Sequence, residues 1–201
     1  MDLSNNHRDI YESFVPKNYA DSFFNLLKSE IPWRQVIYSK KDRNNVVTPR
    51  LTYVTGNYYN NQGTPHPEWI LKLKENLEIQ TQTEFNFILY GYYRDGNDSI
   101  TWHSDDERFL GKNTTNAGVS FGNPRHFQLR NKQTREIEKI LMSHGDMIVM
   151  KNNCQEDYEH AVLKTKEDVG ESYYFDEIIE DINIYSLLDL VMQQKEIYLD
   201  E

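Results

Sequence analysis

Residues 85–107 read FNFILYGYYRDGNDSITWHSDDE, in which an apolar segment gives way to a polar turn and then to a histidine among acidic residues. The run from Phe85 to Tyr93 is almost continuously apolar and aromatic, which is typical of a buried strand. Arg94 to Asp98 then predicts a turn. Further short apolar stretches, each bounded by Gly, Pro, Asn or Asp, cover residues 117–121, 126–130 and 147–150. The second half of the chain is therefore predicted to be mainly β.

The residues before this stretch have helical spacing instead. Phe23, Phe24, Leu27 and Ile31 recur as on one face of a helix, which predicts a helix over residues 18–30. A second helix is predicted after Pro67, because Trp69, Leu73 and Leu77 repeat every four residues. Helices first and many short strands later predict an α+β protein whose strands form a sandwich or barrel.

Composition and charge exclude several classes of protein. With 201 residues, 38% of them hydrophobic, the chain suits one domain with a packed core. It has one cysteine, so neither a disulfide framework nor a four-cysteine zinc site is possible within it. We find no apolar run of membrane-spanning length and no secretory signal pattern, and therefore expect an intracellular monomer without a membrane span.

The formal net charge of −10 is unevenly distributed. Residues 154–201 hold 3 Lys and Arg against 14 Asp and Glu, whereas residues 1–153 hold 19 against 18. The chain is thus a nearly neutral body with an acidic end. A nucleic-acid partner is not excluded, because a local basic face can still bind phosphate.

The segment Thr101–Glu107 contains the most informative chemistry. His103 and Asp105 are two residues apart, so on a strand their side chains project to the same face. A metal would need a third ligand from elsewhere, and His160 is the natural candidate. Two histidines and one carboxylate form the facial triad of non-haem iron(II) oxygenases. A lone His-x-Asp is common without a metal, so the surrounding sequence has to decide.

That sequence resembles the AlkB-like dioxygenases, which depend on 2-oxoglutarate and iron(II), and within them the nuclear DNA-repair branch. The resemblance extends over roughly residues 14–165 and rests on an ordered series of motifs: Thr48-Pro49-Arg50, Asn57-Tyr58-Tyr59, Pro67-Glu68-Trp69-Ile70, Tyr93-Arg94-Asp95-Gly96, Trp102-His103-Ser104-Asp105-Asp106-Glu107, Val119-Ser120-Phe121-Gly122, Arg125-His126-Phe127 and His144-Gly145-Asp146. It implies a double-stranded β-helix, or jelly roll, with N-terminal helices and a substrate-binding lid. We expect a dioxygenase domain over residues 1–166, with its jelly-roll core at about 85–165, and an acidic, diverged segment over 167–201.

The resemblance also implies roles for individual residues. It makes His103, Asp105 and His160 the iron ligands and places the Tyr93 hydroxyl on 2-oxoglutarate. It places three residues on the substrate side: Arg50 and Glu107 near the target base, and Tyr38 as the wedge that fills the gap left by a flipped-out base. The alternatives are solvated surface charges for Arg50 and Glu107 and an ordinary hairpin aromatic for Tyr38. His126 and His144 are interpreted as structural.

The chain departs from the family pattern at the co-substrate. Gly91 stands where the family usually has an asparagine that contacts 2-oxoglutarate. No arginine follows Arg135, although the family supplies arginines after the distal histidine, one of which pairs with the distal carboxylate. Either residues 181–187 form the expected strand but lack the arginines that the family has there, or residues 167–201 form a helical tail. Lys164 or Lys166 would then have to replace the arginine.

The function implied is oxidative demethylation of N-alkylated nucleobases in DNA, with iron(II) and 2-oxoglutarate as cofactors. An RNA or protein substrate is the alternative within the same class of enzyme. A catalytically impaired, nucleic-acid-binding member of the family is the alternative from another class, and it is motivated by Gly91 and the absent arginines.

Overall fold

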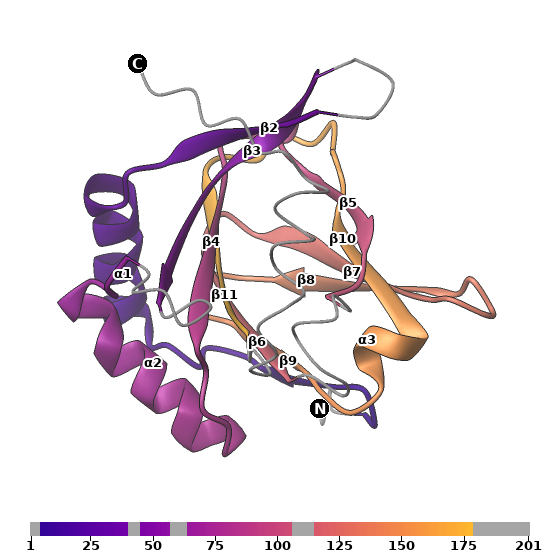
Figure 1. The fold of residues 1–201 in the computed structure, drawn as a ribbon, viewed down its shortest axis with the longest axis horizontal. Coiled ribbons are helices and arrows are strands. Elements are labelled where there is room, and N and C mark those ends of the chain that lie inside the picture. The colour runs from indigo at the N-terminus through magenta and orange to yellow at the C-terminus, as the bar shows by residue number, and fades with distance from the viewer. Residues whose placement is uncertain (1–4, 40–44, 57–63, 106–114, 179–201) are drawn as a thin grey trace.

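The computed structural model describes residues 5–39, 45–56, 64–105 and 115–178. Within these residues the chain forms two antiparallel β-sheets, and two helices cover the larger sheet on the side away from the smaller one (Figure 1). This arrangement confirms the α+β jelly roll that the resemblance implies.

The larger sheet has seven strands in the order β1-β9-β6-β11-β4-β3-β2. Their bounds are β1 Arg8–Tyr11, β2 Arg34–Ser39, β3 Asn45–Gly56, β4 Phe87–Tyr93, β6 Asn116–Gly122, β9 Met147–Met150 and β11 Ser172–Ile178. The smaller sheet has four strands in the order β5-β10-β7-β8. Their bounds are β5 Ile100–His103, β7 Arg125–Asn131, β8 Ile137–Met142 and β10 Tyr158–Val162.

Helices α1 (Lys17–Glu30) and α2 (Glu68–Thr81) confirm the two helices predicted from apolar spacing. Each buries one apolar stripe, which includes Leu27 on α1 and Ile70, Leu73 and Leu77 on α2. A third, single-turn helix, α3 (Cys154–Asp157), leads into β10. No helix in the described part of the chain has the length and apolar character needed to span a membrane.

The larger sheet separates two apolar cores. Ile88 and Tyr90 of β4 pack toward the helices, in a core that also holds Phe121 and Phe175. Tyr93, at the end of the same strand, packs into the second core, between the two sheets. Because side chains alternate across a strand, β4 supplies both cores. The inter-sheet face is the one that carries the candidate site.

Strand β11 lies in the middle of the larger sheet, hydrogen-bonded to β4 on one side and to β6 on the other. Tyr174 is the register partner of Gly91 on β4 and of Ser120 on β6. Residues 172–178 are therefore a central part of the folded sheet, although they follow residue 166, the expected end of the dioxygenase domain. The strand expected over residues 181–187 lies outside the described residues.

Candidate metal centre and its pocket

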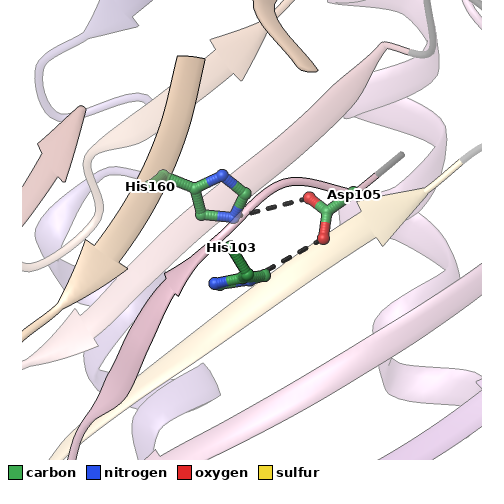
Figure 2. A group of neighbouring side chains, drawn as sticks. All are labelled: His103, Asp105 and His160. Atoms are coloured by element: carbon green, nitrogen blue, oxygen red, sulfur yellow. Dashed lines mark ion pairs between the residues drawn. The ribbon is translucent and has the colours of Figure 1, made fainter. Parts of the chain in front are cut away.

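The two histidines of the predicted triad are neighbours across one strand pair. His160 on β10 is the register partner of His103 on β5, and their ring centroids lie 4.1 Å apart. Asp105 follows two residues after His103, beyond the end of β5, and its carboxylate turns back toward both rings (Figure 2).

The donor atoms of these three residues converge. Asp105 Oδ1 lies 3.8 Å from His103 Nε2, and Asp105 Oδ2 lies 3.5 Å from His160 Nε2 (Figure 2). One ligand atom from each residue can be chosen so that all lie within 4.8 Å of one another. His103 and His160 are 57 positions apart in the sequence. The structure brings them together with Asp105 at a single point.

Hydrogen bonding and burial prepare both imidazoles to bind a cation. His103 Nδ1 lies 2.8 Å from the Thr101 carbonyl oxygen, which can only accept, so Nδ1–H donates to it and Nε2 is the nitrogen that faces the site. His160 is buried, and this desolvation lowers its pKa to about 4. The His160 ring is therefore neutral at physiological pH, which is the form that binds metals.

Two side-chain amides hold Asp105 from other elements. The backbone N–H of Asp105 donates to Oε1 of Gln155 on α3, at 2.9 Å. Nδ2 of Asn116, the first residue of β6, donates to Asp105 Oδ2 at 2.6 Å. Asn116 and Gln155 are both buried. The sequence did not predict a role for either residue, because an asparagine or glutamine beside an apolar stretch does not indicate which side chain it contacts.

A pocket opens beside the triad and contains two more of the predicted site residues. Its lining includes Arg50 of β3 and Tyr93 of β4 together with all three triad residues. Lys164 and Lys166, the predicted replacements for the absent arginine, are exposed and are not part of this lining. Among the described lining residues, Arg50 is the only cation.

A second arginine lies close to Tyr93 but is fully engaged elsewhere. The buried Arg125 donates to the carbonyl oxygens of Asp95, Asp98 and Leu163, and its guanidinium lies 5.4 Å from the centroid of the Tyr93 ring. These contacts tie the turn after β4 to the end of β10. Arg125 therefore supports the pocket wall from behind.

Tyr174 of β11 narrows the pocket. Its ring stacks on Phe127, which in turn stacks on His160, with interplanar angles of 17° and 19°. The Tyr174 hydroxyl lies over Gly118 of β6, where a Cβ would come within 2.1 Å of it. The Tyr174 side chain thus occupies space that only a glycine at position 118 leaves open. This role of Tyr174 was also not predicted.

The remaining predicted residues fall into two groups. Glu107 and the Tyr38 side chain lie outside the described residues. The two histidines interpreted as structural both lie outside the pocket lining: His126 is exposed on β7, and His144 accepts a hydrogen bond from the Gly122 N–H while its other ring nitrogen faces Asp21.

Comparison with known proteins gives concordant results. Residues 9–187 match the 2OG-Fe(II) oxygenase superfamily. The chain is 35% identical over 174 residues to "Alpha-ketoglutarate-dependent dioxygenase alkB homolog 3" of Mus musculus, covering 77% of this chain and 59% of that protein. It is 30% identical to "DNA oxidative demethylase ALKBH2" of Bos taurus, covering 76% of this chain and 61% of that protein.

The chain thus spans about three fifths of these relatives' lengths. Among solved structures, that of OsALKBH1 superposes with a TM-score of 0.63 at 12% identity, covering 87% of this chain and 98% of the other. This likeness supports the fold.

The donor set fits iron(II), because two imidazoles and one carboxylate converge on a point that borders a pocket. The fit to a dicarboxylic co-substrate rests on fewer groups. In the described lining, the polar side chains besides the triad are those of Arg50, Tyr93 and Tyr174, whereas Gly91 offers no side-chain amide.

Proposed function

Because the chain belongs to the 2OG-Fe(II) oxygenase superfamily, we propose that it oxidatively removes alkyl groups from N-alkylated bases of DNA. The observation that carries the proposal is the convergence of His103, Asp105 and His160 at the edge of a pocket. A relative that is 30% identical is named a DNA oxidative demethylase, which supports this choice of substrate.

Each part of the site has a task in this reaction. His103, Asp105 and His160 would hold iron(II) on one face and leave the other positions open. Tyr93 would contact 2-oxoglutarate through its hydroxyl. When bound, iron and 2-oxoglutarate would allow dioxygen to hydroxylate an N-alkyl group: one oxygen atom would enter the alkyl group, the other would enter succinate as 2-oxoglutarate loses CO2, and the hydroxylated carbon would leave the base as an aldehyde. The protein's own residues bind, orient and shield the reactants.

The substrate has to enter the pocket as a base outside the duplex stack, because an alkyl group on a paired base is inaccessible. Arg50 is positioned for this on β3, since it lines the pocket wall beside the triad. We propose that it contacts the target nucleotide, with Glu107 near the base and Tyr38, on the β2–β3 hairpin, as the wedge.

A specific observation favours a second candidate, a binding protein with impaired catalysis. Gly91 lacks a side chain, and the described pocket lining contains no cation besides Arg50. A buried carboxylate without a partner is costly, so 2-oxoglutarate binding is the vulnerable step. Such a protein would bind alkylated nucleic acid and leave it unchanged.

Mass spectrometry of N-methylated oligonucleotides tests the proposal. With iron(II), 2-oxoglutarate and oxygen, we expect loss of the methyl group and release of formaldehyde from single-stranded DNA. The His103→Ala protein is the control and should leave the oligonucleotide intact. Demethylation of a matched RNA or of a methylated peptide, but not of DNA, would refute the DNA assignment.

Arg50 is tested by binding rather than turnover. The Arg50→Ala protein should bind a methylated oligonucleotide about tenfold more weakly, since a hydrogen bond to a charged group is worth about 1.5–3 kcal/mol. Lys164→Ala removes an exposed charge outside the pocket and is the matched control. Equal binding by the two variants would remove Arg50 from the substrate site.

A further inference from the structure

The third metal ligand is not fixed by strand pairing, in contrast to the first two. His103 and His160 are register partners, so the backbone ladder sets their separation. Asp105 lies beyond the last residue of β5. The direction of its carboxylate therefore depends on contacts from other elements, and Asn116 makes a hydrogen bond of 2.6 Å to it.

The orientation of the Asn116 amide follows from its partner. An ionised carboxylate only accepts hydrogen bonds, so the NH₂ group of Asn116 must face Asp105 Oδ2, which lies 2.6 Å from Nδ2. The amide oxygen then points away. Among the described residues, Asn116 Oδ1 has no hydrogen-bond partner, and the side chain has 0% exposure.

An asparagine at this position is costly to the fold. A buried acceptor without a partner loses its hydration and gains nothing in return. Its register partner on β9 is Met150, a buried member of the core between the sheets, so the surroundings on this face would suit an apolar residue of similar size. The hydrogen bond from Asn116 to Asp105 offsets this loss of stability.

Gln155 of α3 contacts the backbone of Asp105, whereas Asn116 contacts its carboxylate. Its Oε1 accepts the Asp105 N–H, and its Nε2 contacts the sulfur of Met150 at 3.8 Å. Asn116, Met150 and Gln155 thus form a buried support behind Asp105. The support holds both the backbone and the carboxylate of a ligand that lies outside any strand.

We propose that Asn116 is a positioning residue for the metal: by engaging Oδ2 of Asp105, it aims the carboxylate at the two histidines and favours coordination through one oxygen. The proposal concerns this chain's metal affinity and rests on the metal site alone, so it is independent of which substrate the protein acts on. Residues that orient metal ligands in this way commonly contribute about 10- to 100-fold in affinity.

Replacing Asn116 by an apolar residue separates positioning from folding. In Asn116→Leu we expect Mn²⁺, titrated into the metal-free protein and followed by the EPR signal of the free ion, to bind about 10- to 100-fold more weakly. The melting temperature of the metal-free protein should change little, because the variant removes the unpartnered buried oxygen together with the hydrogen bond to Asp105, and the two effects oppose each other. Should this variant fail to fold, Asn116→Ala has the same expected effect on affinity.

Two further variants sharpen the result. Ser172→Ala removes another buried side-chain oxygen that has no partner among the described residues, and it should leave Mn²⁺ affinity unchanged. Asn116→Asp places a second carboxylate against the first. It should lower the melting temperature without metal and enlarge the rise on adding Mn²⁺, because the cation relieves the repulsion. Binding of Mn²⁺ to Asn116→Leu within about twofold of the parent would overturn the proposal.

Discussion

His103 and His160 are register partners across strands β5 and β10, with ring centroids 4.1 Å apart. This pairing means that two of the three metal ligands are positioned by adjacent strands of the smaller sheet, next to a shift of register between His160 and Val162. The pocket walls come instead from three strands of the larger sheet: they include Arg50 of β3, Gly91 of β4, which has no side chain, and the large Tyr174 ring of β11. Metal binding and co-substrate binding are therefore expected to respond differently to mutation.

Binding of 2-oxoglutarate is expected to be weak and independent of Lys164. The keto-acid end is compensated by the metal, but the distal carboxylate lacks the arginine of the family, and an unpaired buried carboxylate is costly. Calorimetry with an inert divalent ion in place of iron should give an affinity about one to three orders of magnitude below that typical of the family, on the basis of about 1.5–3 kcal/mol per charged hydrogen bond.

The variant Lys164→Ala should leave that affinity unchanged, because Lys164 is exposed and outside the pocket lining. Micromolar binding by the parent that disappears in Lys164→Ala would contradict this account and identify the lysine as a substitute cation.

A methyl group at position 118 should collide with Tyr174. The Cβ of Gly118→Ala would lie 2.1 Å from the Tyr174 hydroxyl oxygen and 2.4 Å from Cζ. Overpacking of this kind costs about 1–3 kcal/mol, which urea unfolding would measure. In a Tyr174→Leu background the same substitution should cost much less.

Gly91→Ala, on β4 at the other side of β11, is the matched control, because its Cβ would come no closer than 3.4 Å, to Cε2 of Tyr93. Its effect should stay below about 1 kcal/mol. Equal losses for Gly118→Ala with and without Tyr174 would show that the hydroxyl does not occupy the space over Gly118.

Asp98 should stabilise the turn that follows β4 in a pH-dependent manner. Burial alone would raise the pKa of Asp98, but hydrogen bonds from the Arg94 backbone and side chain outweigh it and the pKa is lowered. As the pH falls, the unfolded carboxylate is protonated first, near its ordinary value of 3.8. The stabilisation is therefore fully present above that pH and is lost as the pH falls below it.

Asp98→Asn should accordingly lower the free energy of unfolding by about 2 kcal/mol at pH 7. The gap between variant and parent should narrow as the pH falls below about 4. Denaturant melts at pH 7 and pH 3.5 would measure both, with Asp168→Asn as an exposed control. A gap that stays constant over this range would show that the charge of Asp98 does not contribute.

The sequence predicted the elements that have strong local patterns. The helix predicted over residues 18–30 is α1, and the apolar run 85–93 contains β4. Strand β11 was not predicted, because Ser172–Ile178 lie in the acidic segment that the resemblance did not cover, and their place between β4 and β6 depends on pairing with residues far away in the sequence.

The site residues also divide into those that the sequence predicted and those that it did not. His103 and Asp105 share a short motif, and His160 was chosen as the third ligand by its family resemblance. Asn116 and Tyr174 could not be found in this way, because their contacts with Asp105 and Gly118 depend on sheet register, which sequence spacing does not reveal.

The most direct test of the central claim is an anaerobic titration of the iron(II)-loaded protein with 2-oxoglutarate, followed by visible absorbance. A keto acid that chelates iron(II) gives a weak charge-transfer band. We expect this band to rise to saturation in the parent, at high 2-oxoglutarate concentrations, and to be absent in His160→Ala. A parent protein that binds iron(II) but develops no band at any concentration would contradict the account, because 2-oxoglutarate would then not reach the metal.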